Sequence, residues 1–269
     1  MSGEGGEVLL IGGLTHAGRV TRVGDTVRRP RRPTSPATWA LLEHLERVGF
    51  DGAPRFLGVD DRGREVLSYV PGEAAIEPYE DWALTDEALV SVAELLRRYH
   101  DAAASFDAAG HRWPEFVPAE FRDGLICHND PNLDNVIFSG GIAVALIDFD
   151  LAGPGSAVWD VTCAARLWAP LRDERDIPEV LRGRSLQRLR LFADAYGLPR
   201  RDRSRVVDAA LRTHERCYRV VRAAVESGHE VFGRMWRQGG GSARAERTRH
   251  WIAAHDRQMH GALHGPPAG

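Results

Sequence analysis

The first part of the chain consists of short runs of apolar or alternating residues, a pattern typical of β-strands. The predicted strands are residues 8–11, 19–23, 26–29, 56–59 and 65–70. Two turn segments, Gly24-Asp25 and residues 60–63, separate neighbouring runs and predict hairpins. The pattern therefore predicts a small antiparallel sheet near the N-terminal end of the chain.

One helix is expected within this strand-rich part. The residues before it, Thr34 or Ser35 and then Pro36, are suited to the start of a helix, and Gly49 is suited to its end. Its apolar face is formed by residues spaced three apart, namely Trp39, Leu42, Leu45 and Val48. The first part of the chain is thus expected to be a sheet that carries a single helix.

After about residue 72 the spacing of apolar residues becomes that of helices. Thr85 is a favourable N-cap for the first of them, and carboxylates follow it in the first turn. Further helices are predicted near 160–169, 185–196, 204–225 and 244–263, with a hairpin at 135–138 and 142–147 between them. Residues 238–242 are expected to form a flexible loop. We therefore divide the chain into two lobes, 1–72 and 73–269.

Arginine is the only strongly basic residue of this chain, which contains 35 arginines and no lysine. Residues 1–160 hold 26 acidic side chains and 14 arginines, whereas residues 161–269 hold 12 and 21. A basic half can indicate nucleic-acid binding. Here the arginines recur at helical spacing without regularly placed aromatic residues, which favours solvated helix faces, so we expect no nucleic-acid partner.

Hydropathy and cysteine usage indicate a cytoplasmic protein. No run approaches the length of about eighteen apolar residues that a membrane helix needs, and the first residues do not resemble a signal peptide. The cysteines are Cys127, Cys163 and Cys217, which are odd in number and widely spaced. They predict reduced thiols and neither a disulfide framework nor a zinc site. We expect a monomer or a weak homodimer with no membrane partner.

The chemistry is concentrated around the hairpin in the helical part. His128, Asp130 and Asn135 form the pattern H-x-D-x-x-x-x-N, and Asp148 follows thirteen residues after Asn135. A carboxylate on a loop can orient an acceptor hydroxyl and take its proton, while an amide oxygen and a second carboxylate can hold Mg²⁺. The pattern predicts Asp130 as the catalytic base and both Asn135 and Asp148 as metal ligands.

These residues resemble the aminoglycoside phosphotransferase and choline kinase group of kinase-like enzymes. Asn129 stands where glycine is commoner in that group, and Asp160 matches an aspartate that supports the catalytic loop from behind, with His128 as a second supporting residue. The resemblance implies an α+β, protein-kinase-like fold with two lobes, the second mostly helical. It also implies that the enzyme uses ATP and Mg²⁺ to phosphorylate a hydroxyl of a small molecule.

The same resemblance extends into the strand-rich part. Ser68 and Val70 match the segment between the lobes, where backbone groups bind adenine, and Gly13 lies where the family has a loop over the phosphates. The family's strand lysine corresponds to Arg28, so Arg28 is predicted to contact phosphate while Arg29 points to the opposite face. The glutamate that usually pairs with that lysine should fall near Thr38 or Trp39, and the first helix has no acid at either position.

These residues are compatible with three classes of protein. The retained set of Asp130, Asn135 and Asp148 favours an active phosphotransferase over a catalytically silent nucleotide-binding protein and over a nucleic-acid-binding module. The basic second half argues against a polycationic aminoglycoside as acceptor and favours a neutral or weakly charged metabolite or antibiotic. The acids expected nearest such an acceptor are Glu226, Glu230 and Asp256.

Overall fold

A twisted antiparallel sheet forms the N-terminal part of the protein, in a computed structural model that describes residues 6–10 and 20–265. Its strands are β1 (Val8–Leu9), β2 (Thr21–Val23), β3 (Thr26–Arg29), β4 (Phe56–Val59) and β5 (Glu65–Ser68), in the order β1-β2-β3-β5-β4. Each neighbouring pair is antiparallel. The small sheet predicted from the alternating pattern is therefore confirmed.

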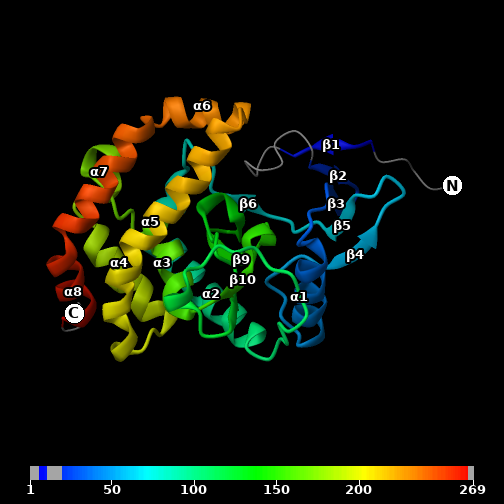
Figure 1. Ribbon diagram of the computed structural model, residues 1–269, viewed down its shortest axis with the longest axis horizontal. Coiled ribbons are helices and arrows are strands. Elements are labelled where there is room, and N and C mark those ends of the chain that lie inside the picture. The colour runs from blue at the N-terminus through cyan, green and yellow to red at the C-terminus, as the bar shows by residue number, and fades with distance from the viewer. Residues whose placement is uncertain (1–5, 11–19, 266–269) are drawn as a thin grey trace.

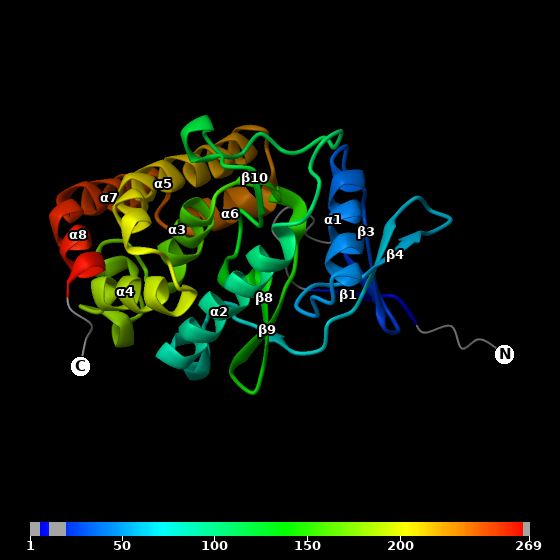
Figure 2. The same cartoon turned by 90° about the horizontal axis from the view of Figure 1, so that it is seen from below.

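Helix α1 (Ser35–Arg47) covers this sheet, as Figures 1 and 2 show. Pro36 lies in its first turn, and Gly49 follows its end with φ of 80°, a conformation that glycine adopts without strain. Leu41, Leu42 and Leu45 are buried. The predicted helix is present, and burial of its apolar face against the sheet and the helical lobe explains why it forms there.

The chain leaves the sheet at Gly72 and enters the second lobe. Gly72 has φ of 139°, and a Cβ at this position would lie 2.4 Å from the carbonyl oxygen of Phe138, so only glycine fits here. The next strand, β6 (Glu73–Ala74), pairs with the hairpin of β8 (Val136–Ser139) and β9 (Ile142–Leu146). A further pair, β7 (Leu125–Cys127) and β10 (Gly153–Gly155), flanks the catalytic segment.

Helices make up most of the second lobe (Figures 1 and 2). They are α2 (Asp86–Ala103), α3 (Ala157–Trp168), α4 (Ser185–Tyr196), α5 (Arg203–Glu226), α6 (Glu230–Gln238), α7 (Gly241–Ala254) and α8 (Asp256–His264). The short 3₁₀ turns are η2 (Asp81–Leu84), η3 (Ala119–Phe121), η4 (Leu133–Asn135), η5 (Phe149–Leu151), η6 (Glu174–Asp176), η7 (Glu179–Leu181) and η8 (Arg200–Asp202). In the described ranges no helix is both long and apolar enough to cross a membrane.

The C-terminal helices differ from the expected pattern in two places. The single helix predicted over 244–263 is wrong, because it is divided at His255 into α7 and α8. The predicted flexible loop at 238–242 is a short turn in which Gly240 and Gly241 have positive φ. This turn connects α7 to α6, a helix that was not predicted although Phe232, Met235 and Trp236 have the i, i+3, i+4 spacing of a helix face.

Candidate active site

The predicted catalytic loop, residues 128–135, lies between β7 and β8 and is held from behind by Asp160 of α3. The two carboxylate oxygens of Asp160 accept hydrogen bonds from the backbone N–H groups of His128 and Asn129, both at 2.8 Å. The Nε2 of His100 lies 2.9 Å from Asp160, and its Nδ1 lies 2.7 Å from the Tyr196 hydroxyl. Because all of these groups are buried, α2, α3 and α4 together fix the position of the loop.

Asn129 occupies a left-handed backbone conformation, with φ of 64°. This geometry gives the physical reason why glycine is commoner at this position, and asparagine is one of the few other residues that adopt it readily. The Asn129 side chain donates a hydrogen bond to the carbonyl oxygen of Leu151 at 2.8 Å. That bond connects the catalytic loop to η5, the turn that follows Asp148.

His128 has the contacts of a supporting residue. Its Nε2 lies 2.9 Å from the Ile147 carbonyl, its Nδ1 accepts from the backbone N–H of Asp130 at 3.3 Å, and its ring packs on Phe149. Burial lowers its pKa below the ordinary histidine value. A neutral ring with both nitrogens engaged orients the loop and carries no exchangeable proton toward the cleft.

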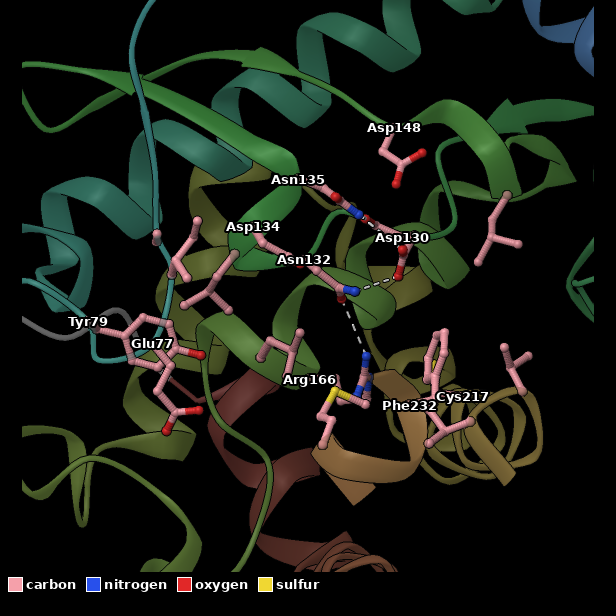
Figure 3. A pocket seen from close by; sticks show the side chains of 18 of the residues that line it. Glu77, Tyr79, Asp130, Asn132, Asp134, Asn135, Asp148, Arg166, Cys217 and Phe232 are labelled. Atoms are coloured by element: carbon pink, nitrogen blue, oxygen red, sulfur yellow. Dashed lines mark hydrogen bonds between the residues drawn. The ribbon is translucent and has the colours of Figure 1, made fainter. Parts of the chain in front are cut away.

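Asp130 lies at the floor of the cleft, as Figure 3 shows. Asn132 donates to one of its carboxylate oxygens at 2.6 Å, and Asn135 donates to the other at 3.0 Å. Burial raises the pKa of Asp130 to about 7, and the nearby carboxylates of Asp148 and Asp134 add to this effect. A base with a pKa near neutrality is well matched to removing a hydroxyl proton as the hydroxyl attacks.

Asn135 and Asp148 face the same space and offer oxygen ligands. The amide nitrogen of Asn135 is used in its bonds to Asp130, which leaves the amide oxygen as its remaining polar atom. Asp148 follows β9 with φ of 61°, an uncommon conformation for aspartate that functional sites often contain. Carboxylate and amide oxygens suit Mg²⁺, and the surplus of negative charge at Asp130, Asp134 and Asp148 fits a bound cation.

The placement predicted for Arg28 and Arg29 is wrong by one residue. Arg29 is the buried side chain, and its Nη1 donates to Asp148 at 2.8 Å. Arg28 lies on the opposite face of β3, where its nearest carboxylate is that of Asp60 at 3.8 Å. Successive residues of a strand point to opposite faces, so a shift of one position in matching the family pattern exchanged the two side chains.

Glu65 of β5 is the glutamate that pairs with Arg29, because β3 and β5 are neighbours and these two residues face each other in register. Glu65 also accepts a hydrogen bond from Nε1 of Trp39 at 2.6 Å. Burial by itself lowers the pKa of Arg29, but the carboxylates around it raise that pKa above its ordinary value. Trp39 thus occupies the helix position where the sequence showed no acid, and the strand supplies the acid instead.

Two clefts meet at this site. The first, of about 270 Å³, lies under the sheet and contains Ser68, Val70 and Arg29 beside apolar residues of both lobes. The second, of about 420 Å³, contains Asp130 and extends toward α5 and α6. Asp134, Asn135 and Asp148 line both clefts. Gly13, predicted to lie near phosphate, falls outside the described residues.

The second cleft combines an apolar wall with four acidic side chains and one arginine (Figure 3). Its apolar lining includes Phe116, Val220, Val221, Phe232 and Met235. Glu226, Glu230 and Asp256 were expected to serve an acceptor, and none of them is among its lining residues. The acids it does contain are Glu77 and the three aspartates nearest the catalytic loop, and Arg166 of α3 lies opposite them.

Comparison with known proteins agrees with this geometry. Residues 111–202, which include the catalytic loop, Asp148 and Asp160, match the model of the phosphotransferase enzyme family. The trifolitoxin immunity protein of Rhizobium leguminosarum bv. trifolii is 34% identical over 264 residues, which cover 93% of this chain and 97% of that protein. This chain belongs to the phosphotransferase enzyme family. The family resemblance expected from the motif residues is confirmed.

Solved structures of this phosphotransferase fold are similar over nearly the whole chain. A choline/ethanolamine kinase family protein from Mesorhizobium loti has a TM-score of 0.62 at 16% identity, with 92% of this chain and 89% of that one covered. The GDP complex of aminoglycoside 2′-phosphotransferase-IIIa has a TM-score of 0.61 at 14% identity, with 94% of both chains covered. The predicted protein-kinase-like fold is therefore confirmed.

Proposed function

We propose that this family member is an ATP-dependent phosphotransferase that moves the γ-phosphate to a hydroxyl of a small molecule. The observation that carries the proposal is the meeting of two clefts at Asn135 and Asp148. One cleft has the apolar walls and backbone edge that suit a nucleotide base, and the other contains the candidate base Asp130. A γ-phosphate held where the two clefts meet would lie between the rest of the nucleotide and the acceptor hydroxyl.

Different residues of this chain would carry out different parts of the reaction. Asp130 accepts the proton of the acceptor hydroxyl while the hydroxyl oxygen bonds to the γ-phosphorus, and the bond from that phosphorus to the β-phosphate oxygen breaks to release ADP. Asn132 and Asn135 orient the Asp130 carboxylate, and Arg29 holds Asp148. Asn135 and Asp148 would hold magnesium, which supplies positive charge that neutralises the phosphate oxygens. Ser68 and Val70 line the proposed base site.

The proposal is tested by Mg²⁺-dependent ADP release from ATP in the presence of a panel of hydroxylated compounds. The wild-type protein should transfer phosphate to at least one acceptor, and Asp130→Asn should bind ATP within a few-fold of the wild type while losing transfer. Undiminished ATP affinity in excess chelator, with no turnover on any acceptor, would instead favour the silent nucleotide-binding protein.

The relative from Rhizobium suggests a biological setting for this reaction. Its name assigns it to immunity against trifolitoxin, and the alignment with it runs over almost the full length of both chains. We infer that the acceptor of this protein is a toxic compound or antibiotic that phosphorylation inactivates. Expression in a sensitive bacterium should raise its tolerance to the true acceptor, and the Asp130→Asn variant, expressed to the same level, should not.

A further inference from the structure

Three arginines beside the acceptor cleft contact only neutral oxygen atoms. Arg166 lies 3.4 Å from the amide oxygen of Asn132, and Arg172 lies 3.4 Å from the carbonyl of Arg166. Arg244 of α7 reaches two backbone carbonyls, at 3.3 and 3.5 Å. In the part of the chain that the structure describes, none of the three has a carboxylate within ion-pair distance. In the described residues these guanidinium groups thus have long contacts and no ion-pair partner.

Several other arginines of the same lobe pair with acids. Arg244 bonds the backbone carbonyl of Asp176, but both carboxylate oxygens of Asp176 are already bound by Arg247, at 2.6 and 3.0 Å. Further along the lobe, Arg184 and Arg188 share Asp86 at 2.6 and 2.5 Å. The lobe therefore contains acids that pair with arginines, and within the described residues none of them lies at ion-pair distance from Arg166, Arg172 or Arg244.

The positive charges of Arg166 and Arg244 act on Arg172. Burial lowers the pKa of Arg172 to about 10, and the positive charges of Arg244 and Arg166 contribute to that shift. A partly buried cation beside two like charges is stabilised strongly by an anion that reaches it. The cluster thus has the electrostatic character of an anion site.

The cluster is continuous with the acceptor cleft. Arg166 lines that cleft, and Arg244 lines a neighbouring hollow of about 560 Å³. Glu77 and Tyr79 line both cavities, so the two spaces meet at these residues (Figure 3). Glu77 is exposed, and water screens its charge more than that of the partly buried Arg172.

We propose that the acceptor carries a carboxylate, which binds to Arg244 in the hollow beyond Tyr79 while the reacting hydroxyl lies at Asp130. Arg172 lines neither cavity and contributes through its positive charge. This inference rests on the proposed phosphotransferase function and narrows its substrate class. The body of the acceptor lies against the apolar wall formed by Phe232 and Met235. The acceptor is then a hydroxylated, amphipathic acid, which excludes polycationic aminoglycosides by charge.

Binding of matched probes tests the proposal without knowledge of the natural acceptor. Calorimetry on the full-length protein would compare ω-hydroxyalkanoates, from hydroxybutyrate to hydroxydecanoate, with their methyl esters. At one chain length the acid should bind at least about tenfold more tightly than its ester, as expected for charge-assisted hydrogen bonds to arginine. Equal affinities of acid and ester at every length would overturn the inference.

Variants of the arginine cluster test whether these residues cause the preference for the acid over the ester. The double substitution Arg172→Gln and Arg244→Gln should remove the preference for the acid while ester affinity is kept, and Arg172→Lys should retain part of it. Arg249→Gln is the matched control, because Arg249 lies on the same helix as Arg244 but pairs with Glu246 on the surface. Thermal unfolding of each variant shows whether it is folded. A preference that survives in a folded double variant would also overturn the inference.

Nucleotide turnover separates this inference from the proposed function. If ATP-dependent transfer occurs but acids and esters are equivalent acceptors, the carboxylate site is wrong and the phosphotransferase stands. If acids bind selectively and the cluster variants abolish that binding, but no acceptor is phosphorylated, the anion site stands and the proposed reaction fails.

Discussion

Replacing Arg29 by methionine should destabilise the protein strongly, whereas the same change at Arg28 should be nearly neutral. The side chain of Arg29 is 7% exposed, and its partner Glu65 is 1% exposed. Arg29→Met leaves the buried carboxylate of Glu65 and the partly buried one of Asp148 without their shared cation, while Asp150 keeps its ion pair with Arg32. Breaking a buried pair by removing one partner costs about 3–5 kcal/mol.

Arg28 provides the control on the same strand. Its side chain is 19% exposed, and its partner Asp60 lies 3.8 Å away and is already bonded to Arg64 at 2.8 Å. A pair of this kind contributes at most about 1 kcal/mol. The two variants should therefore differ by several kcal/mol, which corresponds to roughly 10 °C in Tm for a chain of this size.

Urea unfolding of both variants, with the slopes compared, measures this difference. Adding Glu65→Gln to Arg29→Met should recover part of the lost stability, because the uncompensated carboxylate is then removed. Arg29→Met should also weaken ATP binding and turnover, since Arg29 occupies the position beside Asp148. Equal losses of stability at Arg28 and Arg29, or a larger loss at Arg28, would refute the assignment of Arg29 as the buried partner.

The remaining predictions concern the catalytic loop and the metal. Asp130→Asn should lower turnover by about 10²–10⁴, as measured in single-turnover assays; an equal loss of ATP affinity would show that Asp130 is structural. Asp148→Ala should abolish the effect of Mg²⁺ on ATP affinity, and a Mg²⁺ response unchanged in calorimetry would contradict its role as a ligand. Asp160→Ala leaves two buried N–H groups without partners and should cost about 2–5 kcal/mol of unfolding free energy; unfolding at wild-type denaturant concentrations would count against it. Asn129→Gly should stay within about 1 kcal/mol of the wild type, whereas Asn129→Val should lose more than about 2 kcal/mol because of its positive φ; similar stabilities would remove the backbone argument.

Local patterns in the sequence determined most of the architecture. Alternation of apolar residues and the Gly24-Asp25 turn were enough to predict the hairpin of β2 and β3, because side chains alternate between the faces of a strand. The spacing of Asp130, Asn135 and Asp148 was enough to predict one catalytic segment, since a short loop and a tight hairpin keep residues close in sequence close in space. The prediction omitted α6, although Phe232, Met235 and Trp236 have helical spacing, and it missed the division between α7 and α8, because the apolar spacing does not mark the break at His255.

Only the tertiary structure decided which residues from distant segments meet. The sequence placed Arg28 at the site, but the pairing of β3 with β5 puts Arg29 beside Glu65, and lobe packing then brings Asp148 to it. Such contacts depend on strand register and on how two lobes pack, neither of which leaves a local trace in the chain. The same holds for Arg166, Arg172 and Arg244, which have no ion-pair partner among the described residues. The sequence shows that an arginine is charged, but not whether folding brings an acid close to it.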